Sequence, residues 1–230
     1  MLNFNSQKGL YFVPPLARLC LKQASNRPGG QYKTSMMTLR QKIARFLYPL
    51  IMRLTKGSGK GTRLVNQKQA RPRQPFHNLS TQRNNGQPLD LGQFRDKKVL
   101  LVNTASNCGF TKQFEELQQL HEQFSDTLVV LGFPANDFKE QEKGSDSDIA
   151  RFCQLNFGVT FPLMKKSRVV KGPGQHPVYQ WLTDAARNGW NDHQPDWNFG
   201  KYLVDGQGRL SHYFGPSVSP LSAEVLEAVK

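Results

Sequence analysis

Cys108 is the residue of this sequence best placed for redox chemistry. It stands in VLLVNTASNCGFTKQF (99–114), where an apolar run passes into small polar residues and then into a helical pattern. We expect a cysteine at such a junction to lie near unpaired backbone amides and the positive end of a helix dipole, which favour the reactive thiolate. Thr111 occupies the position at which thiol–disulfide exchangers carry their second cysteine. A thiolate without this partner suits attack on a peroxide, which converts it to a sulfenic acid.

The remaining thiols and imidazoles suggest no second centre. Cys20 and Cys153 complete a set of three cysteines, too few and too scattered for a disulfide framework. We therefore expect a reducing compartment, in which any disulfide is catalytic or transient. The five histidines form no metal-spaced set, so neither a metal nor an organic cofactor is expected. The alternative is that Cys108 has only a structural role as a small buried apolar side chain, which is the commonest role of a free cysteine.

The segments around Cys108 alternate between strand and helix patterns. The runs KKVLLVNTA (97–105) and TLVVLGFP (127–134) are continuously apolar, as in strands that are buried on both faces. Between them, residues 112–124 repeat apolar side chains at helical spacing. A helix that crosses between two buried strands implies that the strands are parallel.

Further elements follow and precede this unit. The stretch GSDSDIARFCQLNFG (144–158) predicts a helix that Ser145 caps and Gly158 ends. Upstream, FHNLST and PLDLGQF flank the turn RNNG (83–86), which predicts a small hairpin.

The C-terminal part predicts an antiparallel pair between helices. A helix is expected to begin at Pro177, and residues 198–214 read as a strand, a turn and a returning strand. A last helix is predicted to start with Ser219 as its cap and Pro220 at its first position. Together these elements predict an α/β protein with a mixed central sheet flanked by helices, for which the thioredoxin-like fold is the commonest form.

The N-terminal third differs from the rest in charge. Residues 1–75 carry fifteen Lys and Arg residues and no Asp or Glu, whereas the part from Phe76 onward has sixteen basic and seventeen acidic residues. The sequence pI of about 9.9 therefore describes the extension rather than the domain. We divide the chain into a basic extension, 1–75, and a thioredoxin-like domain, 76–230. Met36 and Met37 are alternative candidate start sites.

Residues 37–56 of the extension predict a basic amphipathic helix that is kinked at Pro49. Its apolar stripe consists of Leu39, Ile43, Phe46, Leu47, Leu50 and Leu54. Three interpretations stay open: a helix that lies on an anionic membrane surface, an organelle transit peptide, and a solvated tail. Residues 56–74 are expected to be a flexible linker. No apolar run is long enough to cross a bilayer, and no nucleic-acid-binding module accompanies the basic charge.

Four motifs carry a resemblance to a known family. VNTASNCGFT (102–111), LGFPANDFKEQEKGS (131–145), FGVTFPL (157–163) and WNFGKYLVD (197–205) occur in this order. They resemble the glutathione peroxidase family, and the resemblance extends over 76–230. It implies a thioredoxin-like fold and the reduction of hydrogen peroxide or organic hydroperoxides, lipid hydroperoxides included, with a thiol reductant as co-substrate.

The resemblance also implies a set of catalytic residues. The peroxidatic position falls on Cys108, with sulfur rather than selenium, the active-site glutamine on Gln141, and a Trp–Asn pair on Trp197 and Asn198. When a thiolate attacks a peroxide, the leaving hydroxide or alkoxide must be stabilised and protonated. An indole N–H and two amides supply hydrogen-bond donors without adding charge.

Three departures from the family pattern qualify the resemblance. Many members read FPCNQF where this chain has FPANDF, so Ala135 removes one possible resolving cysteine and Asp137 is expected to have a structural role in its loop. Cys153 lies near the position from which thioredoxin-dependent members supply their resolving cysteine, and packing in the core is its alternative. No basic cluster in the domain indicates a dedicated glutathione site, so the family name does not settle the reductant. Glutathione and thioredoxin are both candidates, and resolution by Cys153 would favour thioredoxin.

We therefore expect a thiol peroxidase that acts through Cys108, is resolved by Cys153 and is recycled by thioredoxin or glutathione. The alternatives are a peroxide sensor or relay, and a thiol–disulfide oxidoreductase on the same fold. Only 20 residues separate His176 from Trp197, where tetrameric family members carry an insertion, so a monomer or small oligomer is expected. The expected location is cytoplasmic, at the membrane surface, with a mitochondrial location as the alternative.

Overall fold

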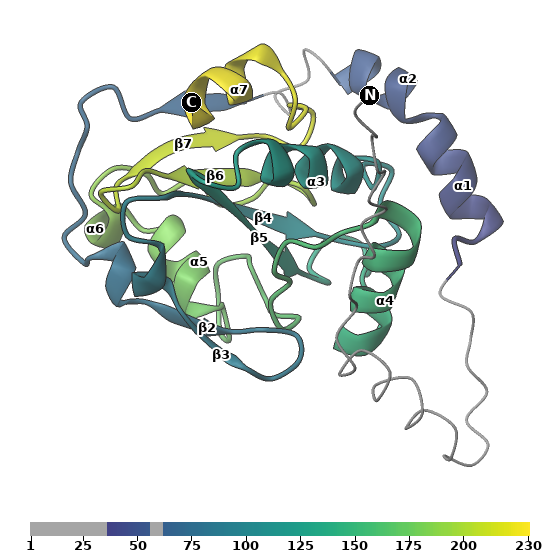
Figure 1. The fold of residues 1–230 in the computed structure, drawn as a ribbon, viewed down its shortest axis with the longest axis horizontal. Coiled ribbons are helices and arrows are strands. Elements are labelled where there is room, and N and C mark those ends of the chain that lie inside the picture. Colours follow the sequence, from purple (N-terminus) through teal and green to yellow (C-terminus); the bar gives the residue numbers. More distant parts are fainter. Residues whose placement is uncertain (1–35, 56–61) are drawn as a thin grey trace, which may run out of the picture. The chain divides into compact units, whose positions relative to one another are not determined.

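The computed structural model describes residues 36–55 and 62–230, which belong to one compact unit. The expectation for Cys20 lies outside the described residues. A central sheet has the strand order β1-β7-β6-β4-β5 (Figure 1). Its strands are β1 (Arg63–Val65), β4 (Lys98–Thr104), β5 (Leu128–Pro134), β6 (Lys201–Val204) and β7 (Leu210–Phe214). β4 and β5 are parallel, and all other neighbours are antiparallel, so the mixed sheet is confirmed.

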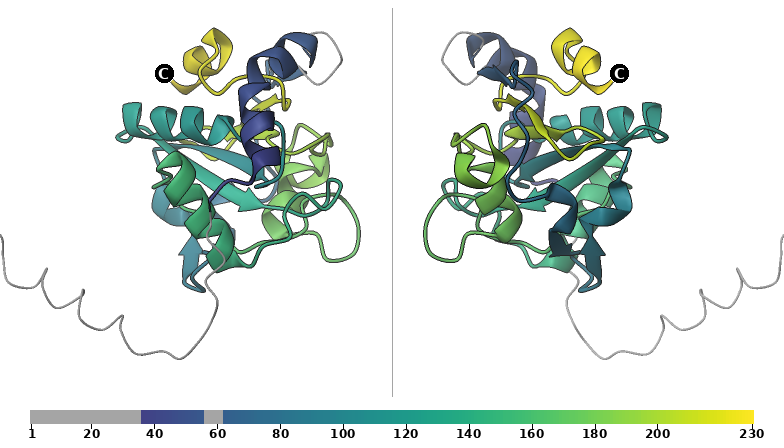
Figure 2. Two further views of the ribbon diagram at one scale, coloured as in Figure 1. Left: turned by 90° about the vertical axis from the view of Figure 1, so that its right-hand side faces the viewer. Right: turned by 90° about the vertical axis from the view of Figure 1, so that its left-hand side faces the viewer.

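Helices cover both faces of this sheet, as the two side views show (Figure 2). Along β4, Leu100 and Val102 pack with α3 (Gln113–Gln123), α4 (Asp146–Phe157) and α7 (Ala223–Val229). The alternate residues Val99 and Leu101 pack with α5 (Pro177–Leu182) on the other face. Because successive side chains of a strand point to opposite faces, a continuous apolar run supplies both cores at once.

Local signals define the elements around the sheet. Ser145 caps α4 with its side chain in a capping box, and Gly158 ends it with a left-handed backbone at φ 65°. Pro177 occupies the first turn of α5. A short hairpin pairs β2 (Ser80–Gln82) with β3 (Pro88–Asp90). These predictions from the sequence are confirmed.

The prediction for the last helix is wrong in its start. α7 begins at Ala223 with Ser222 as its N-cap, three residues beyond the predicted cap Ser219. The Ser219 hydroxyl instead donates a hydrogen bond of 2.6 Å to Glu116 Oε2 and accepts one of 3.1 Å from Leu221 N–H. A tertiary contact with α3 thus uses the side chain that the local pattern assigned to capping.

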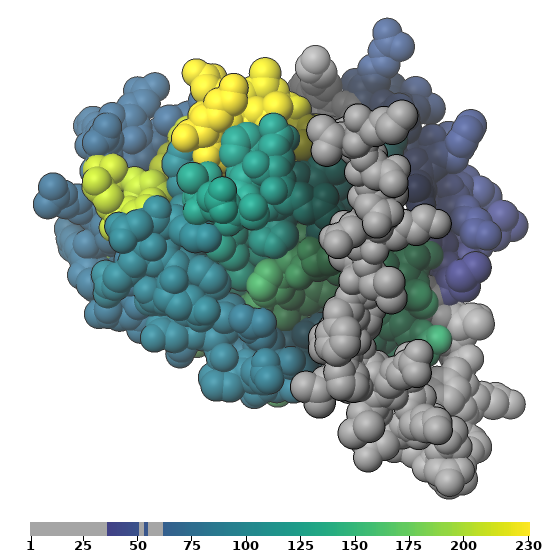
Figure 3. All heavy atoms as spheres, viewed as in Figure 1, coloured from purple at the N-terminus to yellow at the C-terminus, as the bar shows by residue number. Residues whose placement is uncertain are grey.

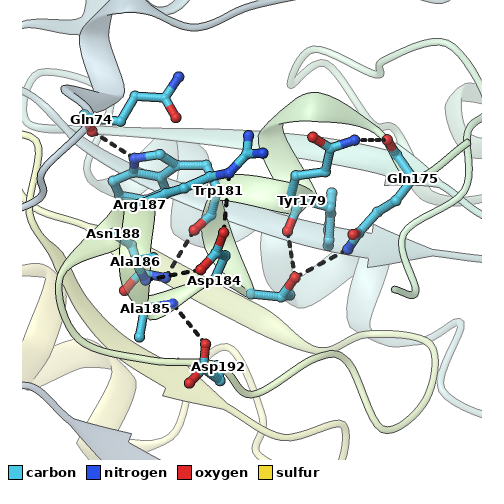
Figure 4. A network of polar contacts seen from close by, with 12 residues as sticks. Gln74, Gln175, Tyr179, Trp181, Asp184, Ala185, Ala186, Arg187, Asn188 and Asp192 are labelled. Carbon is cyan, nitrogen blue, oxygen red and sulfur yellow. Dashed lines mark hydrogen bonds and ion pairs between the residues drawn. The ribbon is translucent and has the colours of Figure 1, made fainter. Parts of the chain in front are cut away.

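The flexible linker predicted before Phe76 is also wrong where the structure describes it. β1 adds an edge strand to the sheet by pairing with β7. Further along, the indole N–H of Trp181 donates a 2.7 Å hydrogen bond to Gln74 O (Figure 4). The backbone N–H groups of Arg73 and Gln74 both donate to Arg187 O in α6 (Ala185–Asn188). The polar composition of this segment predicted a linker, but the segment is ordered by backbone hydrogen bonds to residues that are distant in the sequence.

Gly189 makes the close approach of this segment possible. It ends α6 with φ 80°, and a Cβ there would overlap the backbone carbonyl of Arg71. We expect Gly189→Ala to lower the free energy of unfolding by about 3 kcal/mol, because left-handed strain and overpacking add together. Gly174→Ala is the matched control, since Gly174 has a similar φ of 78° with nothing within 4 Å of its Cβ position. Urea denaturation giving equal losses for the two variants would contradict the close contact.

The predicted amphipathic helix of the extension forms as two short helices. α1 (Leu39–Phe46) begins with a capping box from Thr38, and α2 (Tyr48–Thr55) follows after an interruption at Leu47. The break precedes Pro49, which lacks the N–H that a continuous helix needs there. No helix among residues 36–55 and 62–230 is long and apolar enough to cross a bilayer.

Candidate active site

The loop between β4 and α3 places Cys108 just beneath the surface, with its side chain 2% exposed. The indole of Trp197 and the side-chain amide of Asn198 donate hydrogen bonds to its sulfur, as do the backbone N–H groups of Gly109 and Phe110. Four neutral donors therefore converge on one sulfur atom. The structure brings two residues from the far end of the sequence into direct contact with this thiol.

Burial controls the protonation of the Cys108 thiol. It raises the pKa of this thiol above its ordinary value, and the four hydrogen bonds oppose the rise only in part. Backbone amides and the following helix were expected to favour the thiolate. The amides of Gly109 and Phe110 do lower the pKa of the thiol, but burial raises it more, so the expected net lowering is wrong. α3 begins only at Gln113, and the loss of solvent around the sulfur outweighs the donors that reach it.

The loop after β5 carries Gln141 into the same site. Asn107 N–H donates a 3.0 Å hydrogen bond to Gln141 O, and Asn198 Nδ2 donates one of 2.9 Å to Gln141 Oε1. Lys139 and Glu140, immediately before it, have φ values of 51° and 52°, which non-glycine residues rarely adopt. The Gln141 side-chain oxygen is thus engaged by Asn198, and Gln141 also lines a cleft beside these loops.

The segment before β6 carries Trp197 and Asn198, and β4 holds it in place. Asn103 Nδ2 donates a 2.9 Å hydrogen bond to Trp197 O, and Phe199 N–H donates one of 2.6 Å to Asn103 O. Phe199 has φ 69°, a second place where a non-glycine residue of this site is left-handed. The Trp197 ring packs on Phe138, with 5.6 Å between ring centroids. Backbone strain of this kind persists where surrounding contacts enforce it, and it clusters at functional sites.

Glu142 joins the loops that carry Cys108 and Gln141. Its Oε2 accepts hydrogen bonds from the backbone N–H of Ser106 at 2.8 Å and from the Ser106 hydroxyl at 3.0 Å. Its own N–H donates a 2.8 Å bond to Asn136 Oδ1. Glu142 follows Gln141 in FKEQEKG, and this adjacency is the one feature of the sequence that could have indicated a role for Glu142.

The buried Glu142 carboxyl should make stability depend on pH. Burial raises its pKa from 4.5 to about 7, against the opposing effects of Ser106 and of the Lys166 charge. The folded protein therefore keeps this proton between about pH 4.5 and 7 while the unfolded chain releases it, so stability falls as pH rises through this range. We expect this group alone to contribute a decrease of about 3 kcal/mol.

Glu142→Gln tests this dependence, because it keeps an oxygen that can accept from Ser106 and removes the titration. Urea unfolding at several pH values between 4.5 and 8 should show a shallower decrease in the variant than in the wild type. All other titrating groups are common to both proteins and cancel in the comparison. Parallel curves would mean that the carboxyl is already ionised throughout the range.

Cys153 lies on α4 with its side chain completely buried. Burial, with a smaller effect from the Glu142 charge, raises the pKa of its thiol well above the ordinary value. It shares a core with Cys108, and both are free thiols. In this state the Cys153 sulfur cannot be reached from solvent.

Asp137 has the loop role that was expected of it. Its Oδ2 accepts a 2.8 Å hydrogen bond from Val169 N–H, and its Oδ1 lies 3.9 Å from Arg168 Nε. Ala135 donates its N–H to Thr104 O at 3.0 Å, which joins the ends of β5 and β4. These contacts anchor the loop that leads to Gln141.

Sequence reasoning missed Lys201, which supports the same region from within the core. Its completely buried Nζ donates hydrogen bonds to Gln113 Oε1 at 2.8 Å, Phe199 O at 2.6 Å and Gly215 O at 3.3 Å. Burial lowers its pKa from 10.5 to about 7. The lysine thus ties the start of α3 to the backbone that follows Asn198, and only its place in WNFGK could have drawn attention to it.

A cleft of about 620 Å³ adjoins these loops. Asn107, Gly109 and Gln141 line it on one side, and Arg40 and Gln41 of α1 line it as well. Among residues 36–55 and 62–230, no group of three or more His, Cys, Asp or Glu side chains could hold a metal ion. The site presents a thiol that uncharged donors surround, in a loop that lines a cleft, and this arrangement is typical of a thiol-based redox protein.

Comparison with known proteins identifies the family. The sequence model of the glutathione peroxidase family matches residues 76–183. A glutathione peroxidase homolog, BsaA, of Staphylococcus epidermidis is 43% identical over 146 residues, which are 63% of this chain and 91% of the relative. A glutathione peroxidase-like peroxiredoxin, HYR1, of Saccharomyces cerevisiae is 42% identical over 154 residues, 66% of this chain and 94% of the relative.

A solved structure agrees with the sequence relatives. The crystal structure of Trgpx in apo form superposes with a TM-score of 0.52 at 32% identity, covering 68% of this chain and 96% of the other. The chain belongs to the glutathione peroxidase family and has its thioredoxin-like fold. It is a thiol-dependent peroxidase of the bacterial type, as the resemblance of its four motifs implied.

Proposed function

We propose that the protein reduces hydrogen peroxide and organic hydroperoxides at Cys108, with Trp197, Asn198 and Gln141 as its catalytic hydrogen-bond donors. The observation that carries this proposal is the convergence of Trp197 and Asn198 on the Cys108 sulfur, together with the contact of Asn198 with Gln141. Three segments far apart in sequence supply these groups: Trp197 and Asn198 contact the thiol, and Gln141 is joined to them through Asn198.

The reaction that this arrangement supports is the conversion of a thiol and a peroxide into a sulfenic acid and an alcohol or water. The Cys108 sulfur forms a bond with one peroxide oxygen, the O–O bond breaks, and the second oxygen leaves with the electron pair. Because the buried thiol has a raised pKa, it retains its proton until substrate arrives, and this proton ends on the leaving oxygen. Neutral N–H donors stabilise the transient negative charge without repelling it.

Regeneration of the thiol requires a second sulfur. We assign the resolving role to Cys153, whose thiol would condense with the Cys108 sulfenic acid to form a disulfide and release water. A disulfide needs Cα atoms about 4.4–6.8 Å apart and an accessible route between the sulfurs. If the two Cα atoms lie farther apart than this in the reduced protein, α4 must open locally in each cycle. Thioredoxin would then reduce the disulfide, and glutathione is the alternative reductant.

Cys153→Ala tests this assignment, since alanine keeps the buried site apolar. Peroxide-dependent NADPH consumption is measured with thioredoxin and its reductase, and separately with glutathione and its reductase. We expect the variant to lose nearly all thioredoxin-driven turnover, at least about tenfold, while mass spectrometry still detects the Cys108 sulfenic acid.

Turnover with thioredoxin that survives in Cys153→Ala would make Cys153 a packing residue. If the wild type forms the sulfenic acid but turns over with neither reductant, the sensor or relay alternative replaces the peroxidase cycle.

A further inference from the structure

α1 turns its polar face toward the domain, and its contacts reach the Cys108 loop. Gln41 Nε2 donates hydrogen bonds to Ser106 O at 3.0 Å and to Asn107 Oδ1 at 2.8 Å. Arg45 forms an ion pair with Glu115 at the start of α3. These polar contacts join α1 to the Cys108 loop and to α3, and its apolar stripe takes no part in them.

The opposite face of the helix is apolar and uncovered. Leu39, Ile43 and Phe46 are 74%, 51% and 83% exposed. Leu39 and Ile43 each lie two residues from Gln41, about 200° around the helix. In the part of the chain that the structure describes, seven of the eight exposed large hydrophobic side chains lie between Met36 and Leu54. The space-filling view shows this segment at the outer surface in purple (Figure 3).

The eighth such side chain extends this apolar surface onto α4. Leu155 is 58% exposed, and it lines a groove of about 860 Å³ together with Met36 and Phe46. Lys42 and Lys112 line the same groove. We call the exposed side chains of residues 36–54 together with Leu155 the α1–α2 surface.

Charge indicates what the α1–α2 surface binds. Arg40, Lys42 and Arg53 are exposed, and residues 1–75 contain no acidic side chain. A second copy of the chain would bring like charges together, and a solvated tail would not need a large apolar face. Exposed apolar side chains flanked by unpaired cations suit the interface of an anionic bilayer, where the apolar groups enter the acyl region and the cations remain among phosphates.

We propose that the α1–α2 surface binds anionic phospholipid bilayers. The opposite face of the same helix contacts Ser106 and Asn107 and lines the cleft beside Cys108. Binding therefore holds the cleft close to the lipid surface, and peroxidised phospholipid becomes the favoured substrate. This second step rests on the proposed peroxidase function, whereas the binding itself does not.

The first experiment measures co-sedimentation of the full chain with vesicles. Vesicles of phosphatidylcholine alone are compared with vesicles containing phosphatidylglycerol, at low salt and at high salt. We expect strong binding only to the anionic vesicles, weakened by salt. The double variant Ile43→Ser/Phe46→Ser should bind at least about tenfold less tightly, because two apolar side chains no longer enter the bilayer.

A charge comparison separates this surface from general basicity. Lys42→Ser/Arg53→Ser removes two cations of the α1–α2 surface, whereas Lys165→Ser/Lys171→Ser removes two exposed cations elsewhere. The first pair should weaken binding by about tenfold or more, and the second should leave it nearly unchanged. Equal effects of the two pairs, or full binding by Ile43→Ser/Phe46→Ser, would overturn the proposal. The proposal would also be overturned if the chain failed to bind vesicles and gel filtration showed that it associates with itself through this surface.

Turnover distinguishes the binding step from its consequence. Ile43→Ser/Phe46→Ser should reduce hydrogen peroxide at the wild-type rate but reduce phospholipid hydroperoxide in anionic vesicles several-fold more slowly. A wild-type protein that does not reduce hydrogen peroxide would refute the peroxidase function but would leave the lipid-binding proposal standing. Lipid binding without any advantage for the vesicle peroxide would refute the substrate assignment alone.

Discussion

Cys108→Ser is expected to abolish peroxide reduction with either reductant, with a loss of at least about a thousandfold. A serine hydroxyl can accept the hydrogen bonds that Trp197 and Asn198 donate, but it is far too weak a nucleophile to attack a peroxide. The substituted side chain is 2% exposed and nearly the same in size, so the fold should persist. Steady-state NADPH consumption with hydrogen peroxide measures the effect.

Cys20→Ser is the matched control, because it makes the same chemical change at another cysteine and should leave the rate unchanged. Urea unfolding of Cys108→Ser checks that loss of activity does not reflect loss of structure. A Cys108→Ser protein that retains more than about a tenth of the wild-type rate would mean that another group attacks the peroxide.

Asn198→Ala should have the second largest effect, a decrease in kcat of about a hundredfold or more. Asn198 donates both to the Cys108 sulfur and to Gln141 Oε1, so its loss removes one donor and frees the orientation of another. The remaining burial then raises the pKa of the Cys108 thiol further, because one of the hydrogen bonds that lower it has gone. The pH–rate profile should therefore move toward alkaline pH.

That shift distinguishes a donor role from simple packing, since a cavity left by the missing side chain would lower stability without moving the profile. Asn198→Asp offers a second check. It keeps the shape of the side chain but replaces the donor with a carboxylate, which repels both a thiolate and a leaving alkoxide, so the loss should be at least as large. Activity within threefold of wild type in both variants would remove Asn198 from the catalytic set.

The sequence predicted most of the elements around the site because their signals are local. Continuous apolar runs identified β4 and β5, and the Ser145 cap and Gly158 identified the limits of α4. The start of α7 was misplaced because Ser219 contacts Glu116, a residue that no local pattern connects with it. β1 was missed for the same reason, since three residues become a strand only through pairing with β7.

For the candidate site, too, some features follow from the sequence and others only from the tertiary structure. The resemblance of four sequence motifs to the glutathione peroxidase family implied that Cys108, Gln141, Trp197 and Asn198 form one catalytic set, and their residue types suit the chemistry. Only the tertiary structure decided how far burial raises the pKa of the Cys108 thiol, since desolvation depends on what distant segments place around it. The tertiary structure also decided that α1 contacts the Cys108 loop with its polar face: helical periodicity reveals that a helix has two faces, but the surrounding contacts determine which of them is covered.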